Sequence, residues 1–206
     1  MDIIKKFLAN NSANKFYAED IIANQNPTNV TNQFTTKKRS MIVDHPFWTE
    51  YRIGQSETIL PDGRHVFIAG EYEDYYDPDF FIYNDVFVVD PLLPLENSVV
   101  IYGYPYDIFP PTDFHKAILV NNHIWIIGSI GYDVRKKDHI QICVLDTTTW
   151  KMELKHPTAE NDQAYPPWMD FSIEKNTCIY NEHANEICIN DTWVLHLNTC
   201  HFTLIK

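Results

Sequence analysis

The chain has no long apolar run. None of its stretches approaches the roughly 20 apolar residues that a membrane helix needs. The first ten residues carry Asp2, Lys5 and Lys6, and their apolar stretches are too short for the core of a secretory signal. We therefore expect a cytoplasmic protein that makes no contact with a membrane.

Basic residues are scarce. The chain has 16 Lys and Arg against 28 Asp and Glu, which gives a formal net charge of −12. An acidic surface repels phosphate backbones, so we do not expect nucleic-acid binding, and it attracts a basic protein partner. The simpler alternative is that the charge only keeps the protein in solution.

Cysteine is also infrequent, at four residues: Cys143, Cys178, Cys188 and Cys200. Without a secretory signal we expect reduced thiols packed as small hydrophobic side chains. Cys178, His183 and Cys188 lie close together in the sequence, but their spacing is not that of a zinc site. We expect neither a metal nor another cofactor.

Catalytic motifs are absent as well. The chain contains no G-x-S-x-G nucleophile turn and no Gly-rich phosphate loop. Two polar-aromatic stretches could line a pocket, one with His45 and Trp48 and the other with Asp113 and His115. Asp113 could orient His115 as a general base, but a structural hydrogen bond at the start of a strand unit is the favoured interpretation.

Short apolar runs separated by turns recur three times. Hydrophobic residues make up 45% and aromatic residues 14% of the chain, a composition that favours sheet. Each copy supplies about four strands at a period near 50 residues, which is typical of β-propeller blades. The expected strands are residues 57–60, 65–70, 85–90 and 98–103 in the first copy, 115–120, 124–128, 140–146 and 150–154 in the second, and 170–173, 178–181, 192–198 and 201–205 in the third.

The first 40 residues follow a different pattern. Helical spacing of Ile3, Ile4, Phe7 and Leu8 predicts one short helix, and a second is predicted across residues 13–23. We therefore divide the chain into a helical segment, 1–40, and an all-β propeller domain, 41–206. Three blades are too few to close a ring, so we expect a partial propeller of about three to four blades whose open edge is covered by the N-terminal segment or by a partner.

The repeats resemble the kelch-like, galactose-oxidase-type propellers. The resemblance rests on Ile126-Ile127-Gly128, on Leu145-Asp146 followed by Trp150, and on Asn84-Asp85-Val86. The paired glycines that usually end the second strand are replaced by Ala69-Gly70, Gly128-Ser129 and Asn181-Glu182. No residue can be mapped onto the copper ligands of galactose oxidase.

A closer resemblance is to a group of bacterial kelch-like proteins. It is carried by segments 44–51, 60–64, 76–80, 82–88, 101–105 and 109–115. The resemblance implies the fold and a prokaryotic origin, and it implies no reaction.

The connection after residue 70 is rich in acids and tyrosines and contains no basic residue. The candidate partner-binding residues are Glu71, Tyr72, Glu73, Asp74, Tyr75, Tyr76, Asp77 and Asp79. We expect a long loop at 71–84 that binds a basic protein through tyrosine contacts and charge. A solvated loop is the alternative. A calcium site at Asp74, Asp77 and Asp79 is disfavoured because the spacing matches no established calcium loop.

These observations favour a non-catalytic protein-binding module. Within that class we favour a bacterial immunity-type protein that neutralises a basic toxin. The alternatives are a small hydrolase or lyase that uses a pocket, and a scaffold that self-associates as a homo-oligomer.

Overall fold

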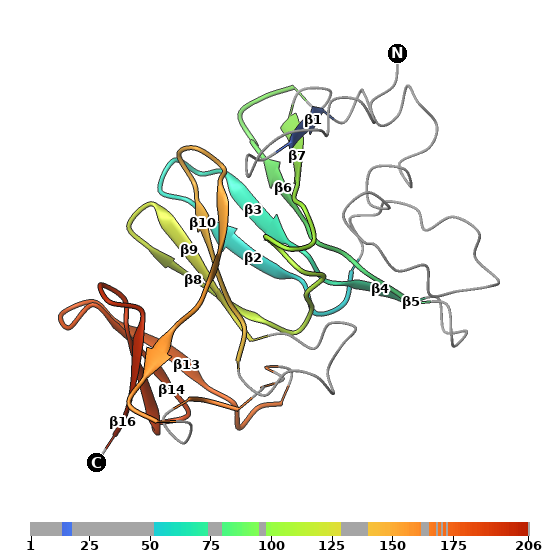
Figure 1. The fold of residues 1–206 in the computed structure, drawn as a ribbon. Coiled ribbons are helices and arrows are strands. Elements are labelled where there is room, and N and C mark those ends of the chain that lie inside the picture. Colours follow the sequence, from blue (N-terminus) through green and yellow to red (C-terminus); the bar gives the residue numbers. More distant parts are fainter. Residues whose placement is uncertain are drawn as a thin grey trace.

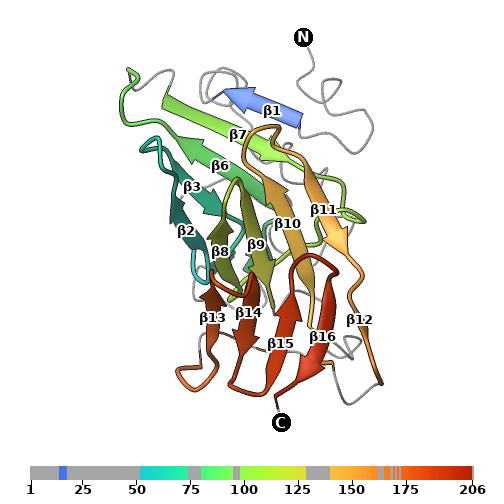
Figure 2. The same ribbon diagram turned by 90° about the vertical axis from the view of Figure 1, so that its left-hand side faces the viewer.

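The computed structural model describes residues 14–17, 52–73, 80–94, 98–128, 140–161, 165–167, 169, 171 and 173–205, and these form an all-β protein. Three sheets, antiparallel except for one short edge strand, and one small hairpin contain the named strands, and each sheet is open. The expected all-β class is confirmed for this part of the chain. Figure 2 shows the three sheets one above another, with the first strand of each on the same side.

Sheet 1 is a four-stranded meander with an added strand at its outer edge. The meander consists of β2 (Ser56–Ile59), β3 (His65–Ile68), β6 (Asp85–Val89) and β7 (Val99–Gly103), and β1 (Asn14–Tyr17) pairs antiparallel with β7. Between β3 and β6 the chain forms a separate hairpin, β4 (Glu71–Glu73) and β5 (Phe80–Ile82).

Sheets 2 and 3 repeat the same meander. Sheet 2 consists of β8 (Lys116–Val120), β9 (His123–Ile127), β10 (Ile142–Asp146) and β11 (Met152–Lys155). Sheet 3 consists of β13 (Cys178–Asn181), β14 (Glu186–Ile189), β15 (Trp193–His196) and β16 (His201–Leu204), and β12 (Thr158–Ala159) pairs in parallel with β16.

Turn chemistry explains where the first strands of sheets 1 and 2 end. Leu60 and Arg64 close the β2–β3 turn through a 2.8 Å backbone bond, and Gly63 supplies a φ of 89°. Two residues join β8 to β9, and Asn121 has a φ of 53°, which asparagine tolerates better than most residues.

Sheet 2 is buried on both faces. Ile124, Ile126 and Leu145 belong to the core shared with sheet 1, whereas Trp125 and Ile142 belong to the core shared with sheet 3. Because successive strand residues point to opposite faces, a strand covered on both sides is a nearly continuous apolar run. This packing is the reason why the second copy of the repeat is the clearest in the sequence.

The structure corrects the expected limits of the third unit. Phe171 lies in a turn and Ile173 in a bend, so neither belongs to the expected opening strand, and β13 is the first strand of this meander. The second strand is β14, which was missed because it has only four residues and alternating burial between turn residues. Asn181 therefore does not end a second strand. The residue that follows the second strand of this sheet is Asn190, with a φ of 50°. The corresponding residues of the other sheets also have a positive φ: Ala69 (48°) after β3 and Gly128 (81°) after β9.

Two further predictions were wrong where the structure can be compared with them. Asn14–Tyr17 is a strand, not part of a helix, because pairing with β7 outweighs a weak helical pattern. Residues 71–84 are not a continuous loop, since they contain the β4–β5 hairpin. The remainder of the expected helical segment lies outside the described residues.

Candidate functional site

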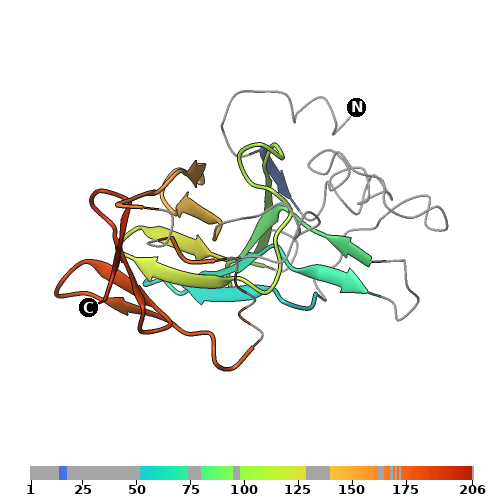
Figure 3. The same ribbon diagram turned by 60° about the horizontal axis from the view of Figure 1, so that its bottom comes forward.

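The two ends of the sheets carry different connections. Tight turns join the first and second strands of each sheet, and they gather at what we call the short-turn end. The longer connections β3–β6, β7–β8 and β9–β10, and that from sheet 2 to sheet 3, leave from the opposite end, called the long-loop end. Figure 1 shows the tight turns on the left and the β4–β5 hairpin on the right, and Figure 3 shows this hairpin extending away from the sheets. Loops on a rigid scaffold commonly carry recognition, so the long-loop end is the first candidate surface.

The structure brings part of the sequence-predicted site together at the long-loop end. Glu71, Tyr72 and Glu73 form β4, and Asp113 and His115 lie in the β7–β8 connection. The other candidates lie outside the described residues. They are the partner-binding candidates Asp74, Tyr75, Tyr76, Asp77 and Asp79 and the pocket candidates His45 and Trp48.

Three backbone hydrogen bonds fix the hairpin base, and two of them join it to the β7–β8 connection. The amide of Gly70 donates to the Thr112 carbonyl (2.9 Å), the amide of Thr112 donates to the Tyr83 carbonyl (3.0 Å), and the amide of Tyr83 donates to the Gly70 carbonyl (2.9 Å). Gly70 has a φ of 90°, and a Cβ there would lie 2.8 Å from the Cβ of Gln55. The closed triangle fixes the direction in which the hairpin leaves sheet 1.

A buried ion pair lies beside this triangle. Arg52 donates from both terminal nitrogens to the Asp85 carboxylate, with Nη2 to Oδ2 at 3.0 Å, and both side chains are almost fully buried. The guanidinium also donates to the Ala69 carbonyl (3.1 Å) and lies 3.6 Å from the centre of the Tyr83 ring. Because a buried charge needs a partner, these contacts hold the hairpin base in one arrangement.

Sequence reasoning missed the Arg52–Asp85 pair. A signal was present, since Asp85 begins a strand whose next three residues are all buried. A carboxylate in such a position needs a cation nearby. The sequence does not indicate which of its 16 basic residues supplies that cation.

His115 joins sheets 1 and 2. Its Nε2 lies 2.7 Å from the Oγ of Ser56, the first residue of β2. Its Nδ1 is buried and has no hydrogen-bond partner among the residues that the structure describes. Burial lowers the pKa of His115 from 6.5 to about 3. A neutral imidazole with so low a pKa is a weak general base near neutral pH, so this arrangement suits a structural contact between strands better than proton transfer.

The described residues contain no group of three His, Cys, Asp or Glu side chains that could hold a metal ion. The four cysteines are free thiols, and burial raises the pKa of Cys178 to about 12. The thiol of Cys178 is therefore neither a ready metal ligand nor a ready nucleophile. Among the described residues, no helix is long and apolar enough to cross a membrane.

The fold and this surface define a class: an all-β protein of stacked antiparallel meanders in which the connections β3–β6, β7–β8 and β9–β10 leave from one end. No protein-family model and no curated protein matches the chain.

Proposed function

We propose that the three sheets are successive blades of a kelch-like β-propeller, and that the protein is a non-catalytic module that binds a basic protein at the long-loop end. The observation that carries the proposal is the anchored hairpin. Its base is fixed by the Arg52–Asp85 pair and by the backbone triangle of Gly70, Tyr83 and Thr112. The segment that follows is the most acidic and tyrosine-rich part of the chain.

A repeated backbone link supports the propeller. The amide of Phe114, just before β8, donates to the Gly54 carbonyl, just before β2 (2.9 Å), and the amide of Phe171, between β12 and β13, donates to the Phe114 carbonyl (3.0 Å). One hydrogen bond of this kind therefore connects sheet 1 with sheet 2. The other connects sheet 2 with the segment that leads into sheet 3. Repeating one relation between neighbours generates a radial array.

The charge distribution supports a basic partner. A net charge of −12 attracts a basic protein at long range, and the acidic hairpin would add local complementarity. A pre-ordered hairpin base reduces the conformational entropy lost on binding. Within this class we favour an immunity-type protein of bacterial origin, which would cover the active site of a basic toxin.

The proposal is tested by capturing partners from an extract of the native host at several salt concentrations. We expect one basic protein, which loses affinity as salt increases. The double variant Asp74→Asn, Asp77→Asn should bind it about tenfold more weakly at low salt. The matched control Glu153→Gln, Glu182→Gln removes two exposed charges outside the hairpin and should bind like the wild type.

Equal weakening in both double variants would show that overall charge, not the hairpin, attracts the partner. A partner that is acidic, or that is captured with no dependence on salt, would reject the proposal.

Self-association is the second candidate. Within the described residues, the Gly54 amide and the Phe171 carbonyl have no partner, so the repeated backbone link is open at both ends. The outward face of sheet 3 carries Ile179, which is 58% exposed. A second copy could continue the array, in which case light scattering should give a dimer and Ile179→Lys should give a monomer.

A further inference from the structure

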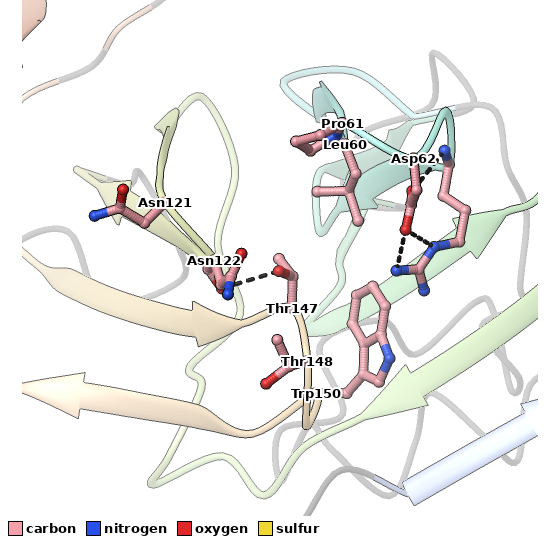
Figure 4. A pocket seen from close by; sticks show the side chains of 9 residues that line it. Leu60, Pro61, Asp62, Asn121, Asn122, Thr147, Thr148 and Trp150 are labelled. Atoms are coloured by element: carbon pink, nitrogen blue, oxygen red, sulfur yellow. Dashed lines mark hydrogen bonds and ion pairs between the residues drawn. The ribbon is translucent and has the colours of Figure 1, made fainter.

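A cavity of about 270 Å³ lies at the short-turn end, between sheets 1 and 2. It is far from the acidic hairpin, so it is independent of the proposed function. Its lining comes from the β2–β3, β8–β9 and β10–β11 turns: Leu60, Pro61, Asp62, Arg64, Asn121, Asn122, Thr147, Thr148 and Trp150. Figure 4 shows Leu60, Pro61 and Trp150 on one side of this group and the Asn and Thr side chains on the other.

The apolar side is held in place. The Trp150 indole stacks on Tyr102, with ring centres 4.7 Å apart and an angle of 17° between the planes. The Trp150 carbonyl accepts a 3.0 Å hydrogen bond from the hydroxyl of Tyr104, and its amide donates to the Asp146 carbonyl (2.8 Å). Leu60 is itself part of the core between the two sheets. This wall is therefore pre-formed, as in most small-molecule sites.

The polar side offers unused hydrogen-bonding groups. Within the described residues, the side-chain amides of Asn121 and Asn122 have no partner, and both residues are exposed. Each amide supplies donors and an acceptor. The Asn122 carbonyl accepts from both the amide (2.8 Å) and the hydroxyl (2.9 Å) of Thr147, which fixes the turn that carries these groups.

The two charges of the cavity are already paired. Arg64 donates from Nε (2.9 Å) and Nη2 (2.6 Å) to Oδ2 of Asp62, and its backbone amide donates to Oδ1 (3.1 Å). An anionic ligand would have to compete with Asp62, and a cationic ligand would find that carboxylate occupied. The cavity therefore suits an uncharged ligand, to which Nη1 of Arg64 can still donate.

We propose that this cavity binds a neutral sugar unit. A sugar ring presents a C–H face, which would pack against Trp150 and Leu60. It also presents adjacent hydroxyls that both donate and accept, which would bind Asn121, Asn122 and Arg64. The volume of about 270 Å³ is slightly below the usual range for small-molecule sites, so it suits a single ring.

The test uses the full chain and the methyl glycosides of glucose, galactose, mannose and N-acetylglucosamine, measured by saturation-transfer NMR and titration. We expect at least one glycoside to bind with a Kd near the millimolar range, as is reasonable for one ring in an open site. Asn122→Ala should raise the Kd of that glycoside about fivefold because hydrogen bonds are lost, and it should leave the melting temperature of the protein unchanged. His183→Ala, in the corresponding β13–β14 turn of sheet 3, is the control and should bind normally.

If Asn122→Ala fails to fold, Asn121→Gly replaces it, because glycine accepts the φ of 53° at that position. Failure of all four glycosides to bind would overturn the proposal, as would binding that neither Asn variant weakens. Preferential binding of acetate or guanidinium, with loss of the Asp62–Arg64 pair, would assign the cavity to a charged ligand instead.

Discussion

The contact between Ser56 and His115 gives a quantitative prediction about acid stability. Burial lowers the pKa of His115 to about 3, whereas the same side chain in the unfolded chain has a pKa near 6.5. Between these values the unfolded chain binds a proton that the folded protein excludes. The free energy of unfolding therefore falls by about 1.4 kcal/mol for each unit that the pH drops below 6.5, and it does not depend on His115 above that pH.

From pH 7 to pH 5, this single residue should lower the free energy of unfolding by about 2 kcal/mol. The variant His115→Gln keeps a group that can bond to Ser56 but cannot titrate. Urea unfolding of both proteins at the two pH values gives four free energies, and contributions from the other histidines cancel in the double difference. The wild type should lose about 2 kcal/mol more than His115→Gln.

Two results would refute this reasoning. One is an equal loss of stability in both proteins between pH 7 and pH 5. The other is available without any variant: an NMR titration in which the ring protons of His115 respond near pH 6.5 would show that the imidazole is not buried as described.

Three further predictions concern packing and burial. Arg52→Ala leaves the Asp85 carboxylate buried without its cation, so the free energy of unfolding in urea should fall by about 3–5 kcal/mol; a loss below about 1 kcal/mol would mean that the pair is solvated. A Cβ at Gly128 would lie 2.5 Å from an aromatic ring carbon of Phe171, whereas one at Gly63 meets nothing within 4 Å. In thermal unfolding, Gly128→Ala should therefore lower the free energy of unfolding by at least about 2 kcal/mol and Gly63→Ala by only about 1 kcal/mol. Equal losses would show that the positive φ, and not the steric contact, determines the effect of both substitutions. At pH 8 a pKa of about 12 leaves Cys178 almost entirely protonated, so its reaction with a disulfide reagent should be on the order of a thousandfold slower than in the unfolded chain; fast labelling of the native protein would contradict this.

The strands of sheet 2 were predictable because they are covered on both faces. Continuous apolar runs such as Ile124 to Ile127 need no knowledge of the partner sheet to be identified as strands. β14 was missed for the opposite reason, since only one of its faces is buried and its four residues lie between turns. The β4–β5 hairpin was interpreted as a loop because each of its strands has only three residues, too few to show a clear alternation.

The candidate site was predictable only as separate pieces. The sequence drew attention to Glu71, Asp113 and His115 by residue type, but it paired His115 with its neighbour Asp113. The structure shows a bond from His115 to Ser56, which lies 59 residues away. The positions expected at His45, Trp48 and Asp74–Asp79 stay predictions, as does the basic partner.

Sequence alone determined the all-β class, the four-strand period and most of the turns. These features depend on alternation and turn chemistry within a few residues, which any short segment carries by itself. Tertiary structure decided which faces meet, which cation neutralises Asp85, and that three turns line an open cavity beside Trp150. Those outcomes depend on distances between residues that are remote in the chain, and such distances are set only when the sheets stack to bury their shared apolar faces.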